Sequence, residues 1–127
     1  MPLMRPLWPI ERTVLEITAR EFPNSAAVFR RQIESAHVVK FQNSGAGFFS
    51  YLAVTDDAAL LTEKSPLDGA HGNVLGFEHG MGFVVFLKDG RLNMIEGYCH
   101  GDDSTSVDFA RVIYGLVPWN PQPDIEA

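Results

Sequence analysis

Two apolar runs around one turn decide the fold: residues 82–98, with the sequence GFVVFLKDGRLNMIEGY. Asp89–Gly90 between such runs is typical of a two-residue type I′ turn, because both central residues need a positive φ. Counting outward from the turn predicts these opposed pairs: Lys88 and Arg91, Leu87 and Leu92, Val85 and Met94, Phe83 and Glu96. Because side chains alternate along a strand, the expected core face collects Phe83, Val85, Leu87, Leu92, Met94, Glu96 and Tyr98. The alternative for Tyr98 is that a bulge at Gly97 turns it to the other face.

Two helices are predicted before the strands. Pro9 suits the first position of a helix, and Ile10, Val14 and Ile17 have the spacing of one helical face. Glu11, Arg12, Glu16 and Arg20 are expected on its polar side, with Glu16 and Arg20 as an i,i+4 ion pair. Pro23 ends this helix. Asn24 or Ser25 is expected to cap a second one, whose apolar residues are Ala26, Phe29, Ile33 and Ala36.

The remaining segments predict further strands over residues 37–41, 48–54 and 73–78, and a strand or short helix over 109–117. Residues 55–72 are expected to form a loop with a short helix at 57–62. The expected fold class is therefore α+β, an N-terminal helical hairpin packed on an antiparallel sheet of about 4–5 strands. One domain over residues 1–127 is expected, with extended tails at 1–8 and 118–127.

Composition narrows the class of function. The chain has 127 residues, 46% hydrophobic and 20% charged, as expected of a globular protein rather than a disordered one. Its 10 basic and 16 acidic residues give a net charge of −6, and the basic residues are scattered. Binding to nucleic acid or to an anionic membrane is therefore disfavoured. A single cysteine, the lack of a signal-peptide pattern and the lack of a long apolar run predict a cytoplasmic protein.

The segment GAGFF at 45–49 and the hairpin sequence at 82–98 carry a resemblance. They resemble a group of small bacterial α+β proteins that share a GxGFF strand start and a GFVLFVKDGRLxMLEGY-like hairpin. The likeness covers roughly residues 40–100. That family has no established activity, so the resemblance implies fold and size and no mechanism.

Glu96 is the first candidate for a catalytic residue. The hairpin count places its carboxylate on an apolar face opposite Phe83, and burying an unpaired charge costs several kcal/mol. Glu96 would then serve as a general base, with His79 or His100 as its partner in acid–base chemistry. The structural alternative is that Glu96 caps the end of the sheet or pairs with Arg30 or Arg31 of the second helix.

Other chemistries have weaker support in the sequence. The four histidines are far apart and no H-x₃-H or C-x₂-C spacing occurs, so neither a metal site nor a cofactor is predicted. Cys99 could form a thiol–imidazole pair with His100 or His79, but a partly buried, unreactive thiol is the favoured interpretation. Gly45–Gly47 lacks the G-K-[ST] of a phosphate-binding loop.

Three functions stay open from the sequence. The first is a module that binds a basic protein partner, resembling in size and charge the immunity proteins that accompany toxins. The second is a small enzyme that uses Glu96 with a histidine. The third is a ligand-binding homo-oligomer. Alternation also places Phe48 and Phe49 on opposite faces of their strand, so a second layer, a partner or a second copy is expected to cover an aromatic face.

Overall fold

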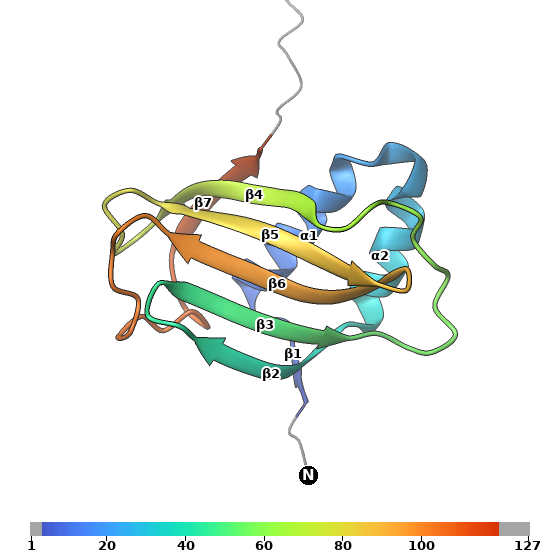
Figure 1. Cartoon of the computed structure of the whole chain (residues 1–127), viewed down its shortest axis with the longest axis horizontal. Coiled ribbons are helices and arrows are strands. Elements are labelled where there is room, and N and C mark those ends of the chain that lie inside the picture. The colour runs from blue at the N-terminus through green and yellow to red at the C-terminus, as the bar shows by residue number, and fades with distance from the viewer. Residues whose placement is uncertain (1–3, 120–127) are drawn as a thin grey trace, which may run out of the picture.

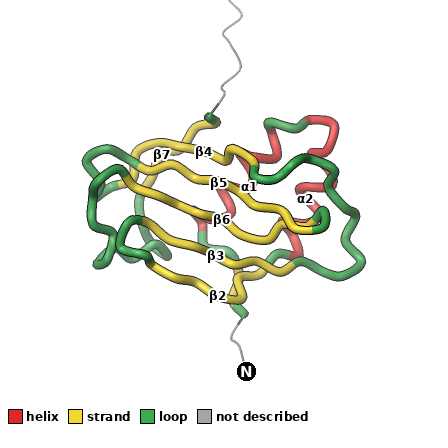
Figure 2. The backbone as a smooth tube through the Cα atoms, in the orientation of Figure 1, coloured by secondary structure: helices red, strands yellow, loops and turns green. Residues whose placement is uncertain are grey.

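The computed structural model describes residues 4–119, which form two helices and an antiparallel sheet of seven strands (Figure 1). The elements in chain order are β1 (Arg5–Pro6), α1 (Pro9–Arg20), a 3₁₀ turn (Pro23–Ser25), α2 (Ala26–Ser35), β2 (His37–Asn43), β3 (Gly47–Ala53), β4 (Leu67–Val74), β5 (Met81–Lys88), β6 (Arg91–Cys99) and β7 (Tyr114–Pro118). Their order across the sheet is β1-β2-β3-β6-β5-β4-β7. Both helices lie behind one face of the sheet (Figure 2).

The α+β class is confirmed, but the predicted number of 4–5 strands is wrong. β1 lies in the segment expected to be an extended tail, and β4 occupies the end of the segment expected to be a loop. Asp68, Gly69, His71 and Gly72 give β4 a sequence with little strand propensity. It forms because it hydrogen-bonds to β5 on one side and β7 on the other. The short helix expected at 57–62 is absent, and the strand expected at 73–78 covers only the last two residues of β4.

Helix α1 begins at Pro9 as predicted and buries Ile10, Val14 and Ile17 against the sheet. Helix α2 follows Ser25, but the Ser25 hydroxyl donates a 2.6 Å hydrogen bond to Glu63 rather than capping the helix. Neither helix among residues 4–119 has the length and apolarity needed to cross a membrane. The predicted pair of Glu16 with Arg20 is replaced by a 3.9 Å pair of Glu16 with Arg12.

The type I′ turn is confirmed, since Asp89 and Gly90 have φ of 52° and 77°. The first pairs outward also agree with the count, but Asn93 is an extra residue on β6 and shifts the register beyond it. Val85 therefore pairs with Ile95, and Glu96 pairs with Val84 instead of Phe83. This bulge moves Ile95 into the core and turns Met94 and Glu96 to the opposite face. The prediction that Glu96 lies on the core face is thus wrong.

Glu11, expected on the polar side of α1, is completely buried. Arg5 of β1 donates two hydrogen bonds of 2.9 and 2.8 Å to the two Glu11 carboxylate oxygens. The same carboxylate accepts from the backbone N–H of Trp8 at 2.7 Å and from the Ser50 hydroxyl of β3. The guanidinium of Arg5 also lies 3.4 Å from the centre of the Trp8 ring. Each of the two carboxylate oxygens therefore accepts two hydrogen bonds, which compensate for the burial of the charge.

Two further buried polar side chains tie loops to the sheet. Gln32 of α2 accepts from the N–H of Leu92 at 2.9 Å and donates to the carbonyls of Ala59 and Gly90. Ser104 donates to Asn43 at 2.9 Å and accepts from the N–H of Gly47. These bonds hold the β5–β6 turn and the loop after β6 in fixed positions.

Replacing the buried carboxylate of Glu11 tests how much it contributes to the free energy of unfolding. We expect Glu11→Ala to lower the free energy of unfolding by about 3 kcal/mol, because it leaves the Arg5 guanidinium and a backbone N–H without their acceptor. Urea denaturation followed by circular dichroism measures this. The matched control is Glu16→Ala on the same helix, whose exposed pair contributes at most about 0.5 kcal/mol. Equal effects of the two substitutions would contradict the assignment.

Candidate binding surface

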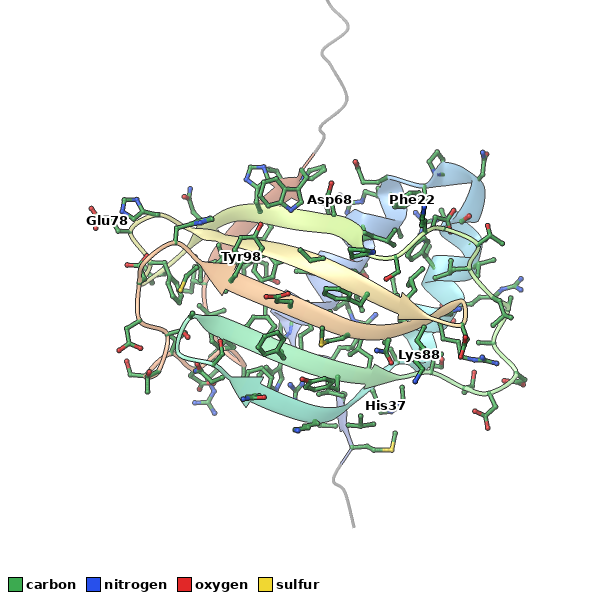
Figure 3. All side chains as sticks on the ribbon, viewed as in Figure 1. Phe22, His37, Asp68, Glu78, Lys88 and Tyr98 are labelled. Atoms are coloured by element: carbon green, nitrogen blue, oxygen red, sulfur yellow. The ribbon has the colours of Figure 1, made fainter. Side chains whose placement is uncertain are left out.

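One face of the sheet has no helix against it among residues 4–119. This face points toward the viewer in Figure 3, where Asp68 and Tyr98 are labelled, whereas α1 and α2 pack against the other. We call it the open face. Strand register places on it Lys40, Gln42, Phe49, Tyr51, Asp68, His71, Val84, Phe86, Met94, Glu96 and Tyr98, and Trp119 joins them through its contacts.

The centre of the open face is apolar. Tyr51 of β3, Met94 of β6 and Phe86 of β5 pair in one row across the sheet. Phe49 and Val84 lie in the next row, on either side of Glu96. All of these side chains are partly exposed. Contiguous apolar groups of this kind on a protein surface are typical of an interaction site.

Charged groups border this apolar centre. On the β2 side, the Lys40 ammonium lies 5.4 Å from the centre of the Tyr51 ring. On the β4 side, Asp68 pairs with Val84, so that Asp68, Val84 and Glu96 follow one another across three strands. The surface thus has an aromatic and aliphatic centre with one cation at one margin and a carboxylate at the other.

A glycine makes room for two aromatic rings at the β4 side of the face. A Cβ on Gly82 would lie 2.5 Å from Cζ and Oη of Tyr98 and 2.9 Å from Cζ2 of Trp119. Trp119 stacks on His71 with ring centres 4.5 Å apart and donates from its indole to the Phe83 carbonyl at 3.2 Å. We call Tyr98, Trp119, Asp68 and Glu96 together the Tyr98 corner.

The electrostatics of this corner are negative. Burial raises the pKa of the Tyr98 hydroxyl above its usual value, and the charges of Asp68 and then Glu96 raise it further. Both carboxylates therefore act on the same hydroxyl, which stays protonated and able to donate a hydrogen bond at neutral pH.

The structure places the three predicted catalytic residues in different positions. Glu96 is on β6, in the middle of the open face. His100 follows the end of β6, four residues on, or about 13 Å along an extended strand. The ring of Tyr98 packs edge-on against His100, with the ring centres 5.5 Å apart. Direct proton exchange needs heavy atoms about 3 Å apart, so this arrangement does not bring Glu96 and His100 together.

His79 belongs to the turn between β4 and β5 and is 60% exposed. Its contact is a 3.8 Å pair with Glu78, which is 80% exposed. Among residues 4–119 no hydrogen bond or ion pair joins His79 or His100 to Glu96, and neither Arg30 nor Arg31 pairs with Glu96. The catalytic assignment of Glu96, His79 and His100 stays a prediction.

Cys99 is the thiol for which an imidazole partner is the alternative prediction. Its Sγ–H donates to the carbonyl of Asp102 at 3.0 Å. Burial raises the pKa of this thiol, and the nearby charge of Asp102 adds to the rise. A raised pKa lowers the thiolate fraction at neutral pH and with it the nucleophilicity.

Asp68 lines a surface hollow of about 300 Å³ together with Glu21 and Lys64, and two further hollows are lined by other residues. One of about 260 Å³ lies between the helices, where Arg12, Arg20 and Arg30 surround it with Glu16 and Glu34. Another of about 360 Å³ lies beside Leu75 and Ile113 at the start of β7. Within the described residues, no three His, Cys, Asp or Glu side chains come close enough to hold a metal ion.

The open face was only partly foreseen from the sequence. Alternation predicted that Phe49 faces away from Phe48, and Phe48 is indeed buried while Phe49 is partly exposed. The Tyr98 corner was missed for two reasons: Trp119 lies in a segment expected to be a tail, and the bulge at Asn93 turns Tyr98 away from the core face on which it was expected. The Gly82 that accommodates both rings was the one available signal, since a glycine inside a strand often marks a close approach.

Comparison of the chain with protein-family models, with curated proteins and with solved structures finds no match. The comparisons thus add no family to the resemblance drawn from the hairpin sequence, and the surface has to be interpreted from its own chemistry.

Filling the space above Gly82 tests the corner. We expect Gly82→Ala to shift the Trp119 indole signal in a ¹H–¹⁵N spectrum and to destabilise the protein by about 1–3 kcal/mol, because the new methyl overlaps both rings. The control is Gly115→Ala on β7, where an added Cβ meets nothing within 4 Å. An unchanged indole signal in Gly82→Ala would refute the placement of the rings.

Thiol labelling tests the environment of Cys99. We expect iodoacetamide to alkylate Cys99 more slowly than free cysteine at the same pH, because its raised pKa leaves less thiolate. The rate is measured by mass spectrometry across a pH series on the folded chain, with the urea-unfolded chain as the control. Faster labelling in the folded chain would instead support the thiol–imidazole pair.

Proposed function

We propose that this protein is a binding module that recognises a basic protein partner through the open face, in the manner of an immunity protein. The single observation that carries the proposal is the uncovered apolar centre of the sheet. Protein interfaces are enriched in tyrosine, phenylalanine, tryptophan and methionine at their core and are polar at their rim. The open face has this composition, with Lys40 and Asp68 at its margins and the Glu96 carboxylate between Phe49 and Val84.

The shape of the face favours a macromolecule over a small ligand. Small-molecule sites are concave and enclose most of their ligand. The centre of the open face is instead built from side chains in register on neighbouring strands, and the hollows described above lie outside it.

Charge indicates the kind of partner. The chain carries a net charge of −6, and Asp68 and Glu96 contribute two of its carboxylates to the open face. A negative potential accelerates association with a positively charged protein and repels nucleic acid. A basic protein surface is therefore the complementary partner.

Self-association is the second candidate, and the same apolar centre favours it. Two open faces could pack against each other about 10 Å apart, as in two-layered sheets. Each copy carries a net charge of −6, and this repulsion opposes the association of two copies. For this reason the basic partner is preferred. The enzyme hypothesis ranks lower, because Glu96 and the histidines lie apart.

A charge placed in the apolar centre tests the proposal. The tagged chain and its Tyr51→Lys variant are used for affinity capture from the native lysate at low and at moderate salt. We expect one stoichiometric basic protein with the unaltered chain, weakened as salt rises and lost with Tyr51→Lys. The control is Ala27→Lys, at an exposed position of α2, which introduces the same charge behind the sheet.

Two outcomes would contradict the proposal. If Tyr51→Lys and Ala27→Lys capture the same proteins as the unaltered chain, the open face is not the binding surface. If the unaltered chain captures no protein and light scattering shows a dimer that Tyr51→Lys converts to a monomer, the open face binds a second copy instead.

A further inference from the structure

The Tyr98 corner combines an aromatic surface with two carboxylates. Tyr98 and Trp119 lie over Gly82, and Tyr98 is one row along the sheet from Glu96 on the same strand. Asp68 lies across Val84 from Glu96, two strand spacings or about 9.5 Å away between Cα atoms. A side chain placed over Val84 and Tyr98 would therefore have one carboxylate on each side.

Both carboxylates lack a partner within residues 4–119. Neither Asp68 nor Glu96 makes an ion pair, and no hydrogen bond from another side chain or a backbone N–H reaches them. Glu96 is also partly buried between Phe49 and Val84. A partly desolvated carboxylate gains most from a partner that brings both charge and hydrogen-bond donors.

We propose that the Tyr98 corner binds an arginine side chain of the basic protein partner, with the guanidinium stacked on the aromatic surface between Asp68 and Glu96. This inference rests on the proposed function and specifies the residue that the partner supplies. Arginine fits better than lysine, because its planar guanidinium stacks on rings and presents five donors in a fixed fork.

The chain contains the same combination in a filled form. Arg5 lies 3.4 Å from the centre of the Trp8 ring and donates two hydrogen bonds to Glu11. There the arginine, the aromatic ring and the carboxylate all come from one chain. At the Tyr98 corner the ring and the carboxylates are present on an outward-facing surface, and the cation is the component that a partner would provide.

A divalent metal fits the corner less well. Calcium and magnesium need several oxygen ligands at about 2.0–2.6 Å from the ion. Among the described residues, no third His, Cys, Asp or Glu side chain joins Asp68 and Glu96 to complete such a ligand set. An extended organic cation spans the separation of the two carboxylates.

The test uses the full chain and two peptides of equal charge, tri-arginine and tri-lysine, titrated into ¹⁵N-labelled protein. We expect tri-arginine to shift the signals of Gly82, Tyr98 and the Trp119 indole, and to bind about threefold or more tightly than tri-lysine. Glu96→Gln and Asp68→Asn each keep the shape of the side chain and remove one charge. Each should weaken the binding of tri-arginine by about threefold. The control is Glu34→Gln on α2, which removes the same charge from the far side and should leave the titration unchanged.

The inference is overturned if tri-arginine and tri-lysine bind equally, or if Glu34→Gln weakens binding as much as Glu96→Gln. Its failure is separable from that of the proposed function. If Tyr51→Lys loses partner capture but tri-arginine binds no better than tri-lysine, the open face remains the interface. The proposed arginine contact at the Tyr98 corner is then refuted. Selective arginine binding with unaltered capture by Tyr51→Lys would keep the corner as a guanidinium site and refute the open face as the surface that binds the captured partner.

Discussion

The buried carboxylate of Glu11 is the interaction on which the arrangement of helix and sheet depends. It accepts from Arg5 of β1, from the backbone at the start of α1 and from Ser50 of β3, so one side chain joins three elements. A buried charge tolerates little displacement of its partners, because each lost hydrogen bond leaves an uncompensated charge. The first turn of α1 is therefore fixed on the sheet at that point.

Both helices pack on one face of the sheet, so the open face has no helix against it among the described residues. Helices α1 and α2 take up the apolar side chains of one face, and Gln32 and Ser104 anchor the loops at its two ends. The open face then presents Phe49, Tyr51 and their neighbours on a sheet of seven hydrogen-bonded strands. Rigid placement lowers the entropy lost on binding, which suits an interface better than a site that must close around a small molecule.

One extra residue on β6, Asn93, decides which side chains lie on the open face. Without the bulge at Asn93, Glu96 would oppose Phe83 and face the helices, and Ile95 would face outward. With it, Ile95 fills the core, and the carboxylate lies beside Tyr98 on the open face. The same shift gives the Glu96 carboxylate a partly exposed position on the open face instead of a buried one facing the helices.

The sequence alone determined the α+β class, the first helix from Pro9, the type I′ turn at Asp89–Gly90 and the opposite orientations of Phe48 and Phe49, because periodicity and turn chemistry are local. The tertiary structure decided the rest. Strand β4 exists because two neighbours pair with it, Glu11 is buried because Arg5 reaches it from another element, and the register beyond Leu92 depends on a bulge. The open face and the Tyr98 corner follow from those choices, since they join residues from β3, β4, β5 and β6 that only strand pairing brings side by side.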